Sequence, residues 1–97
     1  MKITKEQTKN LPNGSKYYKV LLLDELGYEV MDVVGRFTEF PEAVAEAWKY
    51  LDEEIDDIGA WFDIYEYTRE DNHNVRTKEF TNWHGEFVER ENIKLEL

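Results

Sequence analysis

The residues of this chain that could do chemistry are mainly carboxylates, and they are densest at positions 52–57. The sequence there reads Asp-Glu-Glu-Ile-Asp-Asp, so five of six consecutive residues are acidic. The cluster falls where we expect a helix to end, and the last carbonyls of a helix already carry negative partial charge. Asp52 and Asp56 also repel each other at i,i+4 spacing. The cluster therefore opposes local stability, and positions that break a local rule in this way are often functional.

Three interpretations of this cluster are open: a solvated helix end that keeps the protein soluble, a surface that binds a partner, or a cation site. Carboxylates four residues apart on a helix lie about 5–6 Å from each other, which is comparable to the spacing of successive phosphates on a nucleic-acid strand. A second acidic pair, at positions 24 and 25, follows a predicted strand. The candidate partner-binding residues are Asp52, Glu53, Glu54, Asp56, Asp57, Asp24 and Glu25.

Motifs for metal binding or catalysis do not stand out. Neither the acidic cluster nor residues 71–74 have the oxygen spacing and central glycine of a calcium loop. His73 and His84 are eleven residues apart and the chain has no cysteine, so we expect no metal site. A phosphate loop and a nucleophile elbow are also missing, and Ser15 is the only serine. We expect no cofactor and no enzymatic activity.

The charge is unevenly distributed along the chain. The net charge is −10, with 22 acidic and 12 basic residues. Residues 1–23 carry +4, residues 24–66 carry −12 from 14 acids and two bases, and residues 67–97 carry −2. Such a field repels nucleic acid and anionic membranes and attracts basic protein surfaces. We therefore expect a basic protein as partner, with no direct nucleic-acid or membrane binding.

Length and composition indicate one small soluble domain. The chain has 97 residues, of which 41% are hydrophobic and 14 are aromatic, so it can bury a core. The absence of cysteine fits a reducing compartment, and neither a membrane span nor a signal peptide is evident. We expect a single domain over residues 1–97, a polar and loosely ordered leader at 1–15, and a cytoplasmic location.

Hydrophobic periodicity predicts the elements that position these groups. Strands are expected at 16–23, 28–34, 60–68 and 75–81, and a helix at 41–55, with Pro41 in its first turn. The apolar stripe of that helix is Val44, Trp48, Leu51, Ile55 and Ile58. The tail from Glu86 to Leu97 is ambiguous: Ile93, Leu95 and Leu97 alternate like an edge strand, and Phe87 and Val88 are candidates for a short additional strand. The predicted fold is α+β: an antiparallel sheet of about four strands, β-β-α-β-β, with one amphipathic helix on one face.

Alternation along the strands assigns side chains to faces. Tyr18, Val20 and Leu22 share one face of the first strand, and Tyr17, Leu21 and Leu23 share the other. Because both faces are apolar, we expect this strand to be central in its sheet. On the third strand, Trp61, Tyr65 and Tyr67 share a face that Tyr17 or Tyr28 can extend into an aromatic patch. Because Asp63 and Glu66 flank these rings, we interpret the patch as a protein interface and not as a platform for nucleic acid. The alternative is that the leader or the tail covers it.

In size, charge and acidic stretch 52–57, the chain resembles small phage-encoded inhibitors of the anti-CRISPR type. Several such proteins present carboxylates where a nuclease expects DNA phosphates. The resemblance implies a non-catalytic inhibitor or adaptor whose acidic surface docks a basic, nucleic-acid-binding protein. The alternative is a structural module that self-associates as a homodimer, through a sheet edge or the tyrosine-rich face.

Overall fold

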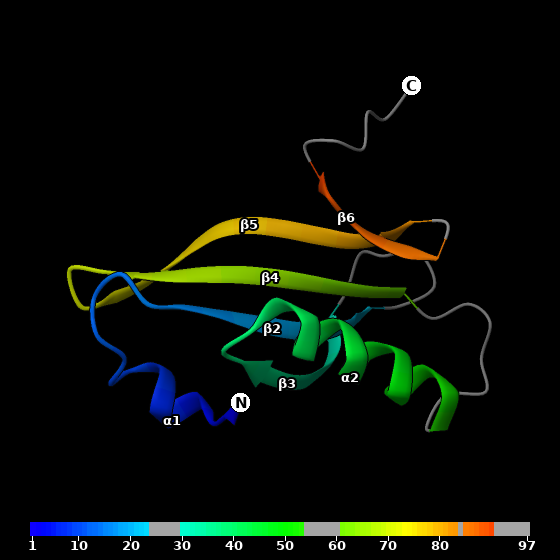
Figure 1. Ribbon diagram of the computed structural model, residues 1–97, viewed down its shortest axis with the longest axis horizontal. Coiled ribbons are helices and arrows are strands. Elements are labelled where there is room, and N and C mark those ends of the chain that lie inside the picture. The colour runs from blue at the N-terminus through cyan, green and yellow to red at the C-terminus, as the bar shows by residue number, and fades with distance from the viewer. Residues whose placement is uncertain (24–29, 54–60, 84, 91–97) are drawn as a thin grey trace.

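A computed structural model describes residues 1–23, 30–53, 61–83 and 85–90, with the backbone alone at residues 31, 51–53 and 83. Its elements are β1 (Lys2–Ile3), α1 (Lys5–Thr8), β2 (Lys16–Leu23), β3 (Val30–Phe37), α2 (Phe40–Glu53), β4 (Trp61–Glu70), β5 (His73–Trp83) and β6 (Glu86–Glu89). The strands form one antiparallel sheet in the order β1-β3-β2-β4-β5-β6 (Figure 1). The α+β class is confirmed, but the expected strand number of about four is too low, because two short strands extend the sheet at its edges.

The central position expected for β2 is confirmed. β2 pairs with β3 on one side and with β4 on the other, and Val20 lies opposite Ile64 of β4. Val20, Leu22, Phe62 and Ile64 form the core on one face together with Phe37. Leu21 and Leu23, on the other face, are also buried. A strand that is apolar on both faces is suited to the middle of a sheet.

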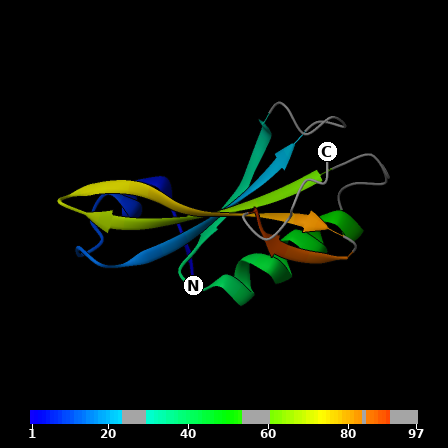
Figure 2. The same cartoon turned by 90° about the horizontal axis from the view of Figure 1, so that it is seen from above.

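Helix α2 lies across one face of the sheet, as Figures 1 and 2 show from two directions. Its most buried residues are Ala43 and Ala47, each 0% exposed, with Phe40 and Val44 packed beside them. The expected stripe through Trp48 is therefore off-centre: Trp48 is half-buried and packs against Phe87 of β6. Small alanines let the helix backbone approach the sheet closely, and the bulky side chains fill the flanks. Ile55 and Ile58 lie outside the described residues.

The leader, for which we expect loose order, forms regular structure. Ile3 of β1 pairs with Arg36 of β3 and is buried. A capping box at Thr4 begins α1, with Gln7 as its reciprocal partner. Figure 2 shows α1 on the side of the sheet opposite α2. The polar leader is ordered because its few apolar atoms and its backbone groups find partners on the sheet, which local composition does not reveal.

The C-terminal half is a long hairpin with a short added strand. Asp71 and Asn72, both at positive φ, turn β4 into β5, which is the conformation of tight two-residue hairpins. β6 pairs with the end of β5 and brings Phe87 against α2. Its range fits the short strand considered at Phe87 and Val88. Among the described residues, no helix is long and apolar enough to cross a membrane.

Candidate functional site

The predicted acidic residues are only partly within the described part of the chain. Asp52 and Glu53 are the last two residues of α2, and only their backbone is described. The other five candidates, Glu54, Asp56, Asp57, Asp24 and Glu25, lie outside the described residues. The last turn of α2 contains no basic residue, so the negative end of the helix dipole has no cation beside it in sequence.

The described flanks show that the two acidic segments are attached to the same end of the sheet. Leu23, which precedes Asp24 in sequence, is the Cα partner of Trp61 across β2 and β4. Trp61 directly follows the segment 54–60, and Leu23 also pairs with Val30, where β3 begins. The chain therefore leaves the sheet into residues 24–29 and re-enters it from residues 54–60 at neighbouring positions. Spacing in sequence does not predict this, because residues 30–53 separate the two segments.

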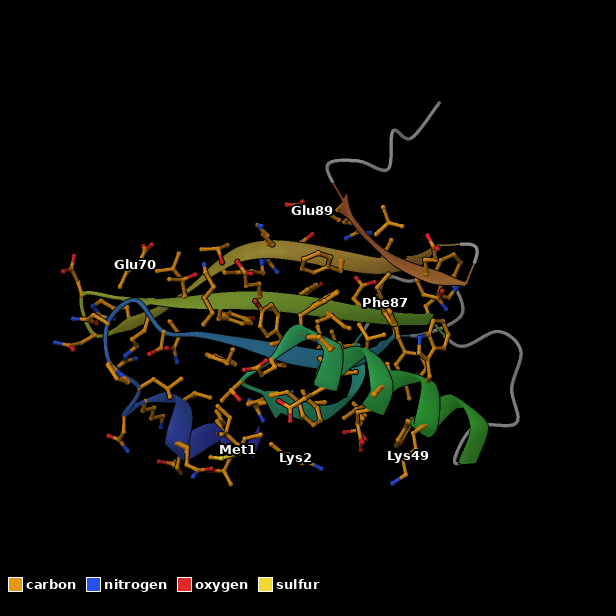
Figure 3. The ribbon with its side chains drawn as sticks, in the orientation of Figure 1. Met1, Lys2, Lys49, Glu70, Phe87 and Glu89 are labelled. Atoms are coloured by element: carbon orange, nitrogen blue, oxygen red, sulfur yellow. The ribbon has the colours of Figure 1, made fainter. Side chains whose placement is uncertain are left out.

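The outer side of α2 carries further carboxylates, beginning at the start of the helix, where Glu42 pairs with the amino group of Met1. Glu42 and Glu46 are half-exposed, and Glu39 just before the helix is exposed. Glu42, Glu46, Lys49 and Glu53 follow one another at helical spacing. Figure 3 shows Lys49 pointing away from the sheet on this side. The acidic segment thus continues a helix surface that is itself mainly acidic.

Glu66 is buried at the centre of a polar network on the α2 side of the sheet. Tyr18 donates to its Oε2 at 3.0 Å, Thr77 donates to its Oε1 at 2.7 Å, and Lys16 Nζ lies 3.4 Å from Oε1. Burial alone raises the pKa of this carboxyl, but these partners together outweigh it and lower the pKa below its ordinary value. Burial, followed by the hydrogen bond to Glu66, raises the pKa of Tyr18 to about 12. Glu66 is a satisfied structural carboxylate and offers no acidic surface.

Asp63 is the second buried carboxyl of β4, and it faces the opposite side of the sheet. It is 2% exposed, and its Oδ1 has no hydrogen-bond partner. Arg90 lies 3.9 Å from its Oδ2 and 3.4 Å from Glu79 Oε2. Burial raises the pKa of Asp63, against the opposing hydrogen bond with Thr81 and the charge of Arg90. Because Asp63 is buried and Arg90 partly neutralises its charge, it adds little negative charge to the protein surface.

The surroundings of the tyrosines differ from the sequence-based expectation. The assignment of Trp61, Tyr65 and Tyr67 to one face is confirmed by the register of β4. The premise that Asp63 and Glu66 make this face acidic is wrong, because Asp63 is buried and Glu66 points to the other side. Cations occupy the face instead. Lys19 Nζ lies 5.1 Å from the centroid of the Tyr67 ring, and the Arg76 guanidinium lies 4.8 Å from that of Tyr65.

The leader covers one part of this face. Arg69 donates to the backbone oxygen of Lys9 at 2.6 Å, and Thr8 of α1 is buried beside it. Tyr17 is 5% exposed and stacks on Tyr67 at 5.1 Å between ring centroids. Tyr65 and Tyr67 remain half-exposed. The alternative prediction, that the leader covers the aromatic patch, therefore applies to Tyr17 but not to Tyr65 and Tyr67. Tyr28 lies outside the described residues.

No cluster of three potential metal ligands occurs in the part of the chain that the structure describes. His73 is exposed at the β4–β5 turn, and His84 is outside the described residues. Comparison with known protein families, with curated proteins and with solved structures found no match. Function must therefore be argued from surface chemistry.

Proposed function

We propose that this protein is a non-catalytic inhibitor or adaptor that docks a basic protein through its acidic end, the end of the sheet to which residues 24–29 and 54–60 are attached. The observation that carries the proposal is that segments 24–29 and 54–60 join the sheet at neighbouring positions, since Leu23 pairs with Trp61. With Asp52 and Glu53 at the end of α2, eight carboxylates belong to chain segments attached there: the seven candidates and Glu29. Electrostatic complementarity would steer such an end toward a basic surface and select against acidic ones.

A basic surface of this kind is typical of proteins that bind nucleic acid, so we propose that class as the partner. Carboxylates at the spacing of phosphates would then compete with the partner's own ligand. Nuclease inhibition of the anti-CRISPR type is the specific form of this proposal. It is supported by the charge pattern and by the size of the chain alone.

The test neutralises four acids and keeps the rest of the chain. The variant combines Asp52→Asn, Glu53→Gln, Asp56→Asn and Asp57→Asn. Immobilised protein is exposed to bacterial lysate at about 20 mM salt, where screening is weak, and eluted by a salt gradient. We expect the unmodified protein to retain a basic protein that elutes steeply with salt, and the variant to lose it while its thermal unfolding is unchanged or shifted upward.

A matched control removes the same charge elsewhere. Exposed acids away from the acidic end are Glu6, Glu39, Glu70 and Asp71, and their neutralisation gives the same net charge. If this control loses the partner as completely as the first variant, net charge alone explains retention and the proposal fails. Elution of the captured protein by duplex DNA tests phosphate mimicry; a partner that binds DNA and this protein simultaneously contradicts it.

Self-association through a sheet edge is the alternative, and the described edge disfavours it. On β5, Thr77 is an extra residue in the register with β4, where Arg76 pairs with Tyr67 and Lys78 with Glu66. Bulges and charged side chains at an edge hinder the addition of another strand. Light scattering over a range of concentrations separates the two functions, because a dimer that persists at high salt would favour self-association.

A further inference from the structure

A row of side chains crosses four strands on the face of the sheet opposite α2. Arg36 of β3 is the partner of Lys19 on β2, and Lys19 is the partner of Tyr65 on β4. Along β4, Tyr67 is on the same face and pairs with Arg76 of β5. We call Arg36, Lys19, Tyr65, Tyr67 and Arg76 the cationic tyrosine strip. Its members come from positions 19 to 76, and only the strand register brings them together.

The positive charges of the strip are incompletely balanced. Lys19 and Arg36 lie directly opposite each other, which is unfavourable for like charges. Within the described residues, neither takes part in an ion pair. Arg76 shares the carboxylate of Glu79 with Arg90, at 3.2 Å and 3.4 Å. A chain with almost twice as many acids as bases thus places facing cations together without a carboxylate between them. This pattern indicates an anionic ligand.

The tyrosines of the strip are held in a fixed orientation. Tyr67 stacks on the buried Tyr17 with an interplanar angle of 9°. Lys19 and Arg76 sit over the rings of Tyr67 and Tyr65. Both rings are half-exposed on a paired strand, so they need little ordering on binding. Lys19 and Arg76 therefore lie over the ring faces on which a nucleobase would stack.

The strip also continues into a hollow at the edge of β5. The hollow has a volume of about 210 Å³ and is lined by Arg76, Thr77, Lys78, Glu79, Glu89 and Arg90. Arg90, which lines it, directly follows the last residue of β6. Three of these side chains are cationic and two are carboxylates, so the lining has a small excess of positive charge beside the strip.

We propose that the cationic tyrosine strip binds single-stranded nucleic acid. Phosphates contact Arg36, Lys19 and Arg76, and bases stack on Tyr65 and Tyr67 as the cations move from the rings to the phosphates. Stacking on aromatic side chains beside lysine and arginine is the usual mode of binding single strands. An acidic peptide would need the cations but not the rings, which is why nucleic acid is the better fit. Acids elsewhere on the molecule weaken the attraction at low salt and are screened beyond about 10 Å at 0.1 M salt.

The inference concerns a different surface from the proposed function and does not rest on it. Neutralising Asp52, Glu53, Asp56 and Asp57 is expected to leave oligonucleotide binding unchanged or to strengthen it. Loss of the protein partner with retained oligonucleotide binding would therefore separate the two proposals.

The experiment measures fluorescence anisotropy of labelled 12-nucleotide dT and dC oligomers with the full chain at several salt concentrations. The variant Lys19→Gln/Arg36→Gln is expected to lose at least ten-fold in affinity and to reduce the slope of log K against log salt by about 1.4, which is about 0.7 for each phosphate contact removed. Tyr65→Leu is expected to lose about five-fold or more without a change in slope. Removing opposed like charges is not expected to harm folding, which circular dichroism checks.

The matched control is Lys2→Gln/Lys49→Gln, which removes two exposed cations that lie away from the strip (Figure 3). It is expected to change affinity by less than two-fold. The proposal is overturned if no saturable binding occurs at 50 mM salt, or if this control loses as much affinity as the strip variant. It is also overturned if Tyr65→Leu has no effect, or if a poly-glutamate peptide binds as tightly as the oligomers; either result would assign the strip to an acidic peptide.

Discussion

At the scale of single residues, β4 carries two buried carboxyls on opposite faces with opposite energetic roles. Glu66 has three polar partners, whereas Asp63 has an unpartnered oxygen and a more distant arginine. The pKa of Glu66 is lowered and that of Asp63 is raised. The folded state therefore stabilises the charged form of Glu66 and disfavours the charged form of Asp63.

Asp63→Asn is expected to stabilise the protein at pH 7. Because the folded pKa is raised, the cost of the charged carboxyl grows as pH rises from about 3.9, the unfolded value, through the folded pKa. Removing the charge should recover about 1 kcal/mol, or about 4–8 °C in melting temperature. Thermal melts from pH 3 to 8 test this, and the gain should disappear below about pH 4. A variant that is destabilised at pH 7 would show that the charge of Asp63 is needed to hold Arg90.

Glu66→Gln is expected to have the opposite effect. The lowered folded pKa means that the carboxylate contributes stability above about pH 4.3, the unfolded value, and that this is lost as pH falls through the folded pKa. We expect a loss of about 1–3 kcal/mol at pH 7, because Tyr18, Thr77 and Lys16 lose a charged acceptor. Urea unfolding at pH 7 and at pH 3 measures it. An equal loss at both values would mean that shape, and not charge, matters at this position.

At the scale of elements, α2 is positioned by its smallest side chains. Ala43 and Ala47 are fully buried against the sheet, and Ala45 on the same helix is exposed. The periodicity of large apolar residues predicted the helix and its packing on one face of the sheet, but not the line of closest contact. Helical spacing fixes which residues share a side, whereas the distance to the sheet depends on the side chains of β2, β3 and β4.

Ala47→Leu is expected to destabilise the protein by about 1–3 kcal/mol, because the added atoms have no space between helix and sheet. Ala45→Leu makes the same chemical change on the exposed side and is expected to stay within about 0.5 kcal/mol of the unmodified protein. Chemical denaturation of the two variants in parallel is the measurement. Similar losses in both would indicate that helix propensity, and not packing, controls stability here.

At the scale of the whole molecule, opposite charges are separated into different regions. The acidic segments are attached to one end of the sheet, while cations gather on the face opposite α2. The net charge of −10 therefore does not describe the local field at either surface. This separation is what allows two different ligand classes to be proposed for one small chain.

Added salt is expected to raise the melting temperature. The molecule measures 38 Å along its longest axis, and at 0.01 M salt charges interact over about 30 Å, against about 8 Å at 0.15 M. Screening then relieves the self-repulsion of a net-negative chain. Thermal melts in 10–150 mM sodium chloride check this, and the variant neutralised at Asp52, Glu53, Asp56 and Asp57 should show a weaker dependence. A melting temperature that falls with salt would mean that attractive pairs dominate.

The sequence by itself determined the features that depend on local periodicity. Alternation grouped Val20 with Tyr18 and Leu22 within one strand, and Tyr65 with Tyr67 within another, because successive side chains of a strand point to opposite sides. Helical spacing and Pro41 located α2, and the apolar residues on both faces of β2 predicted its central position. The same local reasoning located the acidic segments but left their use open among solvation, partner binding and cation binding.

Only the tertiary structure decided what depends on contacts between distant segments. Pairing of Leu23 with Trp61 brings the flanks of both acidic segments together, and pairing of Lys19 with Arg36 creates a cationic row within an acidic chain. Sequence neighbourhood alone predicts that Glu66 and Asp63 surround the tyrosines. In the structure, neither carboxylate is exposed beside the tyrosines. Glu66 is one residue away from Tyr65 and Tyr67 along the strand, so its side chain points to the other face, and Asp63 is buried.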